Sequence, residues 1–230
     1  MQLTTSKKIA LLLGATGLVG SALLNELLAH DAYIRIIAPT RRPMHRQHDK
    51  LENPIINFDE LEAYAGKLPC HDVFIALGTT IKKAGNKEAF RKVDFDYIVK
   101  GALVAKAGGA SQCLLVSSSG ADTDSRFFYT SVKGQTEEAI KDLDFWATHI
   151  FQPGVLVGNR EEFRLGERIG IGVSNLLRRI SPEILGDYNP TKVRVLAQKM
   201  LEAAQGMEPG VQVHGAMSLL EGKALSGEDV

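Results

Sequence analysis

The sequence predicts an α/β protein with a doubly wound parallel sheet and a small C-terminal portion. Short apolar runs alternate with longer amphipathic segments, which is typical of strands alternating with covering helices. The first apolar run leads directly into a glycine-rich turn and then into a helical pattern. The content of 44% hydrophobic residues is ordinary for a globular protein, and the longest apolar run, Ile9 to Leu13, is too short to cross a bilayer.

Six short apolar runs are predicted to be the strands of the sheet. They are Lys8 to Leu13, Tyr33 to Ala38, Pro54 to Phe58, Val73 to Leu77, Gln112 to Val116 and Trp146 to Phe151. The helices expected between them are Leu18 to Ala29, a short piece from Asp59 to Ala65, Lys87 to Gly108, and Tyr129 to Leu143. Strands joined by helices form βαβ units, so the sheet is expected to be parallel and covered on both faces.

Charge and cysteine content narrow the class of protein. The 27 lysines and arginines balance 27 acidic residues, which argues against a surface that is basic throughout and binds nucleic acid. Cys70 and Cys113 are too few for a disulfide framework, and the N-terminus lacks a secretory signal. The six histidines have no metal-ligand spacing. We therefore expect a cytoplasmic protein without a metal, a nucleic-acid partner or a membrane partner.

The glycine-rich turn predicts a dinucleotide site. Gly14, Gly17 and Gly20 follow the first strand and open the first helix, as in a Rossmann fold. Gly14 permits the tight turn, Gly17 lets the backbone approach a pyrophosphate, and Gly20 allows the helix to pack closely on the strand. The helix N-terminus offers free N–H groups to the phosphates. A glycine-rich turn without a ligand is the alternative interpretation.

The residues after the second strand favour NADP(H) over NAD(H). An NAD site places an acidic residue there, which binds the ribose 2′-hydroxyl. This chain has Ala38-Pro39-Thr40-Arg41-Arg42 instead. Two guanidinium groups suit a 2′-phosphate, because arginine binds phosphate with paired hydrogen bonds. A solvated basic turn is the alternative.

With a dinucleotide site in view, the chain divides into two unequal parts. Residues 1–155 are predicted to form the NAD(P)-binding Rossmann domain. Residues 156–230 lose the strict alternation and are predicted to be a small substrate or lid portion packed on that domain. Within it we expect helices near Leu165–Ile180 and Thr191–Ala204 and a strand near Val211–His214.

Tyr129 and Lys133 form a YxxxK motif on the helix that follows the fifth strand. Positions i and i+4 share one helix face, so the phenol and the ammonium can point into one site. A free tyrosine has a pKa of about 10, and a nearby cation lowers it toward the range of a general acid. The same lysine could hold the nicotinamide ribose. A solvated helix face is the alternative.

A serine run is expected to supply a hydroxyl that orients a substrate carbonyl. The fifth strand ends in Ser117-Ser118-Ser119. We favour Ser117 or Ser119, because neighbouring residues leaving a strand point to opposite sides. Capping of the loop by these hydroxyls is the alternative.

These segments together resemble the Tat-interacting-protein family of atypical short-chain dehydrogenases/reductases, and the chain looks closest to uncharacterised bacterial members. The resemblance covers almost the whole chain, through LLLGATGLVG, APTRRP, ALGTT, KAGNKEAFRKVDFDY, LLVSSSGA, FFYTSVKGQTEE and FQPGVLVGNREEFR. It departs from the family at Asn57, where similar proteins often carry Asp near the adenine, and in the serine run, of which relatives keep only the first.

The resemblance implies a set of NADP(H) contacts. By position they are Thr16, Gly17, Leu18 and Val19 at the pyrophosphate, Arg41 and Arg42 at the 2′-phosphate, Leu77, Gly78 and the following Thr79 on the adenine and ribose side, Tyr129 and Lys133 at the nicotinamide, and Leu156 and Arg164 closing over the cofactor.

Two functions fit these features. The first is an NADPH-dependent oxidoreductase that reduces a small carbonyl substrate, with Tyr129 as proton donor. The second is a non-catalytic NADPH-binding protein that senses redox state and signals through a protein partner. Both need the glycine turn and the arginines, but only the first needs the Tyr–Lys pair. Epimerase chemistry on a nucleotide sugar ranks last, because the short C-terminal portion leaves little room for such a substrate.

Overall fold

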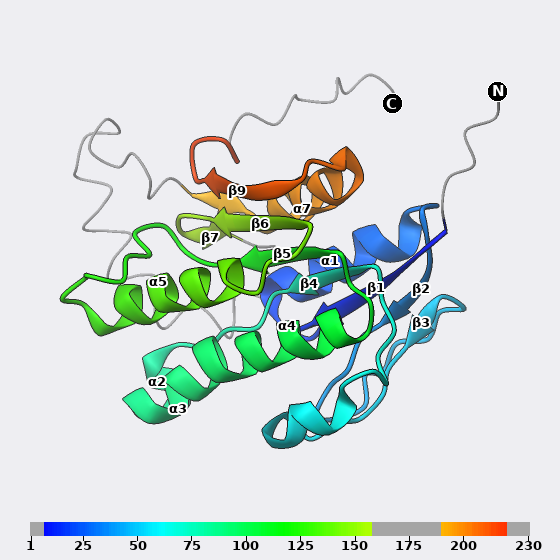
Figure 1. Cartoon of the computed structure of the whole chain (residues 1–230), viewed down its shortest axis with the longest axis horizontal. Coiled ribbons are helices and arrows are strands. Elements are labelled where there is room, and N and C mark those ends of the chain that lie inside the picture. The colour runs from blue at the N-terminus through cyan, green and yellow to red at the C-terminus, as the bar shows by residue number, and fades with distance from the viewer. Residues whose placement is uncertain (1–6, 158–189, 220–230) are drawn as a thin grey trace.

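The computed structural model describes residues 7–157 and 190–219 of the chain. Seven parallel strands form its main sheet, in the order β3-β2-β1-β4-β5-β6-β9 (Figure 1). The strands are β1 (Lys8–Leu13), β2 (Tyr33–Ile37), β3 (Leu51–Glu52), β4 (Asp72–Ile75), β5 (Gln112–Val116), β6 (Ala147–Gln152) and β9 (Gly210–Gly215). Two further strands, β7 (Leu156–Val157) and β8 (Thr191–Lys192), pair separately.

Helices cover both faces of the sheet (Figure 1). The helical segments are α1 (Leu18–Ala29), the 3₁₀ segment η1 (Phe58–Tyr64), α2 (Ile81–Ala84), α3 (Lys87–Arg91), the π-helical turn η2 (Lys92–Asp96), α4 (Tyr97–Ala107), α5 (Phe128–Lys141) and α7 (Val193–Gly206). The apolar residues of α1 and α7 pack on one face, and those of α4 and α5 pack on the other. Because successive side chains of a strand point to opposite faces, Leu12 belongs to the first of these cores and Leu11 and Leu13 to the second.

The strand order creates a crevice between β1 and β4. From β1 the chain builds outward to β2 and β3, and then returns to place β4 on the other side of β1. Connections that leave two neighbouring parallel strands in opposite directions open a space at their carboxyl ends, where ligands of such sheets bind. The predicted doubly wound α/β fold is confirmed, and this crevice is the expected binding edge.

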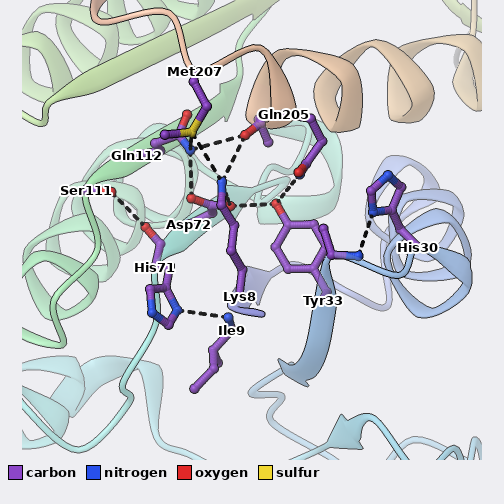
Figure 2. Close-up of polar contacts among 12 residues, drawn as sticks. Lys8, Ile9, His30, Tyr33, His71, Asp72, Ser111, Gln112, Gln205 and Met207 are labelled. Atoms are coloured by element: carbon purple, nitrogen blue, oxygen red, sulfur yellow. Dashed lines mark hydrogen bonds and ion pairs between the residues drawn. The ribbon is translucent and has the colours of Figure 1, made fainter. Parts of the chain in front are cut away.

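At the opposite, amino end of the sheet, a buried polar network joins the strands to the end of α7 (Figure 2). Asp72 is fully buried and accepts hydrogen bonds from Tyr33 Oη at 2.6 Å and Gln112 Nε2 at 2.9 Å. Lys8 Nζ forms an ion pair with the same carboxylate at 3.1 Å and donates to the Ala204 carbonyl. These contacts fix where α7 ends relative to four strands.

Most helices and strands lie close to their predicted positions, but the predicted position of the third strand was wrong. The predicted Pro54–Phe58 strand is replaced by β3 at Leu51–Glu52, and Phe58 already begins η1. Pro54 has no N–H to give to a ladder. The Asn53 side chain donates to the Ala38 carbonyl at 2.7 Å, so a side chain replaces the strand contact there. Beyond it, only a single bridge pairs Thr40 with Ile55 among the described residues.

The long predicted helix over Lys87–Gly108 is divided. α3 and α4 are separated by η2, whose i→i+5 geometry inserts a residue into the helical pattern. In the C-terminal portion the helix near Leu165–Ile180 lies outside the described residues. The later helix begins two residues after Thr191, and β9 joins the main sheet beside β6.

Candidate cofactor site

A cavity of about 520 Å³ opens at the carboxyl ends of β1, β2 and β4, which is the crevice expected from the strand order. Its wall combines three strand-end loops with α2, α3 and neighbouring residues. The lining residues are Gly14, Ala15, Thr16, Gly17, Pro39, Thr40, Arg41, Phe58, Ala76, Leu77, Gly78, Thr79, Lys83, Ala84, Ala89, Val93 and Tyr97.

The glycine turn after β1 packs against the end of β4 as closely as the backbone allows. Gly14 has φ +95°, and a Cβ built there would lie 2.5 Å from the Ala76 carbonyl oxygen. A Cβ on Gly20 would lie 2.0 Å from the Gly14 carbonyl oxygen. Gly17 is the N-cap of α1 and has no side chain to cap the first turn. The free N–H groups of that turn are therefore left for a ligand, which fits the pyrophosphate of a dinucleotide.

The described wall of the cavity carries two cations and no carboxylate. Arg41 follows β2, and Lys83 comes from α2. Two aromatic rings, Phe58 and Tyr97, lie 5.7 Å apart between centroids and line the same cavity. A cavity with cations and aromatic faces suits a ligand that has both phosphate groups and a base.

Lys133 lies behind the wall formed by Gly78 and Thr79. A Cβ built on Gly78 would lie 3.9 Å from Lys133 Nζ and 3.4 Å from Asp94 Oδ1. Lys133 Nζ and Asp94 Oδ1 form an ion pair at 2.7 Å, with side-chain exposures of 7% and 0%. Asp94 Oδ2 accepts a hydrogen bond from the Thr79 N–H at 2.8 Å. The ammonium of Lys133 is thus held at a fixed place near the cavity.

Tyr129 stands on the first turn of α5, one helical turn before Lys133. Its side chain is 37% exposed, and its ring packs against Phe90 with centroids 5.6 Å apart. It does not belong to the residues that line the described cavity. The motif therefore combines a buried lysine with a partly exposed tyrosine, and neither residue lines the described cavity.

Of the three hydroxyls of the serine run, Ser119 Oγ has a hydrogen bond, whereas the buried Ser117 Oγ and Ser118 Oγ have none of normal geometry. Ser119 Oγ donates to the Gln152 carbonyl at 3.1 Å. Ser117 Oγ is buried and makes no hydrogen bond of normal geometry, although it lies near enough to the Glu137 carboxyl to favour its ionised form. Burial has the larger effect and raises the pKa of Glu137, whose two oxygens accept from Gln152 Nε2 at 3.0 and 2.9 Å. Of the two candidate serines, Ser117 has the hydroxyl left for a further partner.

The structure brings seven of the predicted site residues into one cavity wall, and the other described ones do not line that cavity. The seven are Gly14, Thr16, Gly17, Arg41, Leu77, Gly78 and Thr79. The remaining described ones are Leu18, Val19 and Gly20 in the first turn of α1, Arg42 next to Arg41, Ser117 and Ser119 after β5, Tyr129 and Lys133 on α5, and Leu156 in β7. Arg164 lies outside the described residues. Asn57 caps η1 by accepting from the Asp59 N–H at 3.0 Å.

Among the charged and aromatic residues of this region, sequence reasoning missed four: Phe58, Lys83, Asp94 and Tyr97. For Asp94 a signal existed. Phe90, Asp94 and Ile98 are spaced by four, and all three are buried, so an acidic residue stands within an apolar helix stripe. A buried carboxylate needs a partner, which is Lys133.

Comparisons with known proteins agree with this geometry. Residues 10–117 match the NAD dependent epimerase/dehydratase family. Protein HTATIP2 of Rattus norvegicus is 36% identical over 222 residues, which cover 95% of this chain and 88% of that protein. Protein FMP52-1, mitochondrial, of Scheffersomyces stipitis is 34% identical over 227 residues, which cover 92% of this chain and 97% of that protein. The solved structure of MoeE5 in complex with UDP-glucose and NAD matches with a TM-score of 0.65 and 14% identity, over 91% of this chain and 79% of that one, so this likeness concerns the fold.

The fold and the glycine-lined cavity define a protein of the doubly wound, Rossmann-like α/β class, and residues 10–117 of it match the NAD dependent epimerase/dehydratase family. Within that class the chain belongs to the family of Protein HTATIP2 and the FMP52 proteins, which confirms the resemblance to the Tat-interacting-protein family. Its closeness to bacterial members stays a prediction.

Proposed function

We propose that this protein is an NADP(H)-dependent oxidoreductase that reduces a small carbonyl compound. The observation that carries the proposal is the charge of the cavity wall, which holds Arg41 and Lys83 and, among its described residues, no Asp or Glu. An acidic residue at the end of β2 would favour the free 2′-hydroxyl of NAD, whereas a guanidinium there favours a 2′-phosphate. We assign the 2′-phosphate to Arg41, with Lys83 as a second cation for the anionic ligand.

We assign the parts of a carbonyl reductase to Tyr129, Lys133 and Ser117. When bound, the cofactor supplies a hydride to the carbonyl carbon. The Tyr129 phenol donates its proton to the carbonyl oxygen, so the substrate leaves as an alcohol and the phenol is reprotonated from solvent. Lys133 donates hydrogen bonds to the cofactor ribose. The Ser117 hydroxyl donates a hydrogen bond to the carbonyl oxygen and orients it.

Two observations favour a second function, an NADPH-binding redox sensor without catalysis. Asp94 forms an ion pair with Lys133 at 2.7 Å and balances its positive charge. The ammonium therefore attracts negative charge on the Tyr129 phenol less strongly than an unpaired lysine would. Tyr129 also lies outside the lining of the described cavity. A sensor needs the cofactor cavity and a protein partner, but not the phenol.

Cofactor turnover separates the two functions. The purified full chain is first titrated with NADPH, and carbonyl compounds of varied size are then screened for NADPH oxidation at 340 nm. General acid catalysis contributes about 100- to 10,000-fold, so Tyr129→Phe should lose that much turnover while it keeps NADPH affinity. Tyr64→Phe, which changes a tyrosine of η1 rather than of α5, is the matched control. Tight NADPH binding without turnover by the wild type would exclude the reductase and favour the sensor.

Location and partners stay predictions. In residues 7–157 and 190–219, no helix combines the length and the apolar character that a membrane span requires. We retain a cytoplasmic location as the expectation from the sequence, although the FMP52 relatives are named mitochondrial. A small carbonyl compound is the partner that the proposed reaction requires.

A further inference from the structure

The strand β9 forms one edge of the main sheet (Figure 1). It pairs with β6 on one side, and within residues 7–157 and 190–219 no strand pairs with its other side. A strand edge of this kind presents free N–H and C=O groups, so it can pair with a further strand. Natural proteins usually protect such an edge with charged side chains, proline, a bulge or a very short strand.

The two edges of the sheet differ in this protection. The β3 edge has only two residues, one of which is Glu52, and Glu52 forms an ion pair with Arg35. The β9 edge has six residues, and its sequence Gly-Val-Gln-Val-His-Gly contains no Asp, Glu, Lys, Arg or Pro. Its register with β6 runs without a shift from Gly210 to Gly215, so no bulge interrupts it. The β9 edge therefore lacks the features that would prevent pairing.

The two valines of β9 direct their backbone groups away from β6. In a parallel pair, alternate residues of a strand bond to the neighbouring strand, and the residues between them face the other side. The Gly210 N–H donates to the Trp146 carbonyl at 2.9 Å, so Gly210 and Gln212 face β6. Val211 and Val213 therefore present their N–H and C=O groups at the free edge. Their side chains are 51% and 50% exposed, which agrees with an edge that the described residues leave uncovered.

We propose that β9 is a dimer interface, at which the same strand of a second copy of this chain pairs with it in antiparallel orientation. A two-fold axis through Gln212 places Val211 opposite Val213 of the partner subunit, and Val213 opposite the partner's Val211. These are the residues whose backbone groups point outward, so each valine pair exchanges both of its N–H···O bonds. The two sheets then continue into each other across the axis.

A second copy fits this edge because the edge is complementary to itself. A two-fold interface brings the same surface of both subunits together, and here valine meets valine and no like charges meet. Phe151, which pairs with His214, belongs to the core on the α7 side, so Val211 and Val213 lie on the opposite face of the sheet. On that face the dimer covers both exposed valines with the same two side chains of the other copy.

Sedimentation velocity of the full chain over a concentration series tests the assembly. The wild type should sediment as a species of twice the 25.0 kDa chain mass. Val213→Pro removes an outward N–H that β6 does not use, and edge strands tolerate proline at such positions, so this variant should be a folded monomer. Val213→Thr keeps the N–H and a β-branched side chain and should stay dimeric. A wild type that is monomeric at every concentration, or a dimer that Val213→Pro leaves intact, would overturn the proposal.

Disulfide crosslinking tests the register and does not depend on the proline variant. The axis places the two Gln212 residues directly opposite each other, with Cβ atoms about 4.5 Å apart, so Gln212→Cys should form an intersubunit disulfide when an oxidant is added. Val213→Cys is the matched control, because its counterpart in the partner is a diagonal neighbour roughly 7 Å away, beyond the reach of a disulfide. The native Cys70 and Cys113 are both buried. A crosslink in Val213→Cys, or none in Gln212→Cys, would reject this pairing of the two strands.

Discussion

A methyl group on Gly14 should disable the cofactor cavity while leaving the protein folded. In Gly14→Ala the new Cβ would lie 2.5 Å from the Ala76 carbonyl oxygen and 2.9 Å from the Leu77 nitrogen. Both atoms belong to backbone that cannot rotate away, and Ala76 and Leu77 line the cavity. The turn after β1 and the end of β4 must therefore move apart.

The size of the effect follows from two separate costs. A residue other than glycine at positive φ costs about 1–2 kcal/mol, and overpacking costs about 1–3 kcal/mol. Gly14, with φ +95°, incurs both, so we expect a loss of about 2–5 kcal/mol in the free energy of unfolding. Gly210, with φ +84° and nothing within 4 Å of a built Cβ, incurs only the first. Gly210→Ala is therefore the matched control, with an expected loss of about 1–2 kcal/mol.

Urea unfolding measures the two stabilities, and NADPH titration of the folded proteins measures the cavity. We expect at least about a tenfold loss of NADPH affinity in Gly14→Ala and wild-type affinity in Gly210→Ala. If the two variants bind NADPH equally well, the tight contact between the glycine turn and β4 does not shape the cofactor site, and the reasoning is refuted.

Three further results are expected. Lys83→Ala should weaken NADPH binding by about tenfold, whereas its neighbour Lys82→Ala, outside the cavity lining, should leave it unchanged; equal effects in a titration would remove Lys83 from the site. Tyr33→Phe removes a buried hydroxyl from the network of Figure 2 and should cost about 1–3 kcal/mol in urea unfolding, and an unchanged midpoint would contradict this. Burial lowers the pKa of His149 and of His214 below 6.5, so the folded state binds protons more weakly than the unfolded chain. The stability that depends on these two neutral histidines is therefore present above about pH 6.5 and is lost as the pH drops below it. The loss in the free energy of unfolding between about pH 7.5 and about pH 5.5 should be smaller in His149→Gln than in the wild type.

The parts of the fold that local patterns encode were predictable from the sequence. The strand from Lys8 to Leu13, the helix from Leu18 to Ala29 and the strand from Gln112 to Val116 have the predicted bounds. In each, a buried apolar run or apolar periodicity coincides with a clear boundary, and Gly17 marks the start of the helix. The third strand could not be placed in this way, because β3 has only two residues and its pairing with the β2 side continues after Asn53 only as an isolated bridge between Thr40 and Ile55.

The candidate site also contains both residues that local patterns predict and residues whose positions depend on how the whole chain packs. The glycine turn and Arg41 were predictable, because spacing after a strand determines where these residues lie. Lys83 and Tyr97 come from elements whose positions depend on how the whole chain packs, so no local pattern identifies them. Asp94 belongs to both groups. Its place in an apolar helix stripe is visible in the sequence, but its pairing with Lys133 arises only when η2 packs on α5.

The preference for NADPH over NADH tests the central claim most directly. Both dissociation constants should be measured by calorimetry in the wild type, in Arg41→Ala, and in Arg46→Ala as a control from the same loop outside the cavity lining. We predict that the wild type binds NADPH about 10- to 100-fold more tightly than NADH, that Arg41→Ala removes most of this preference, and that Arg46→Ala keeps it. Equal affinity of the wild type for the two cofactors would contradict the assignment of this cavity to NADP(H).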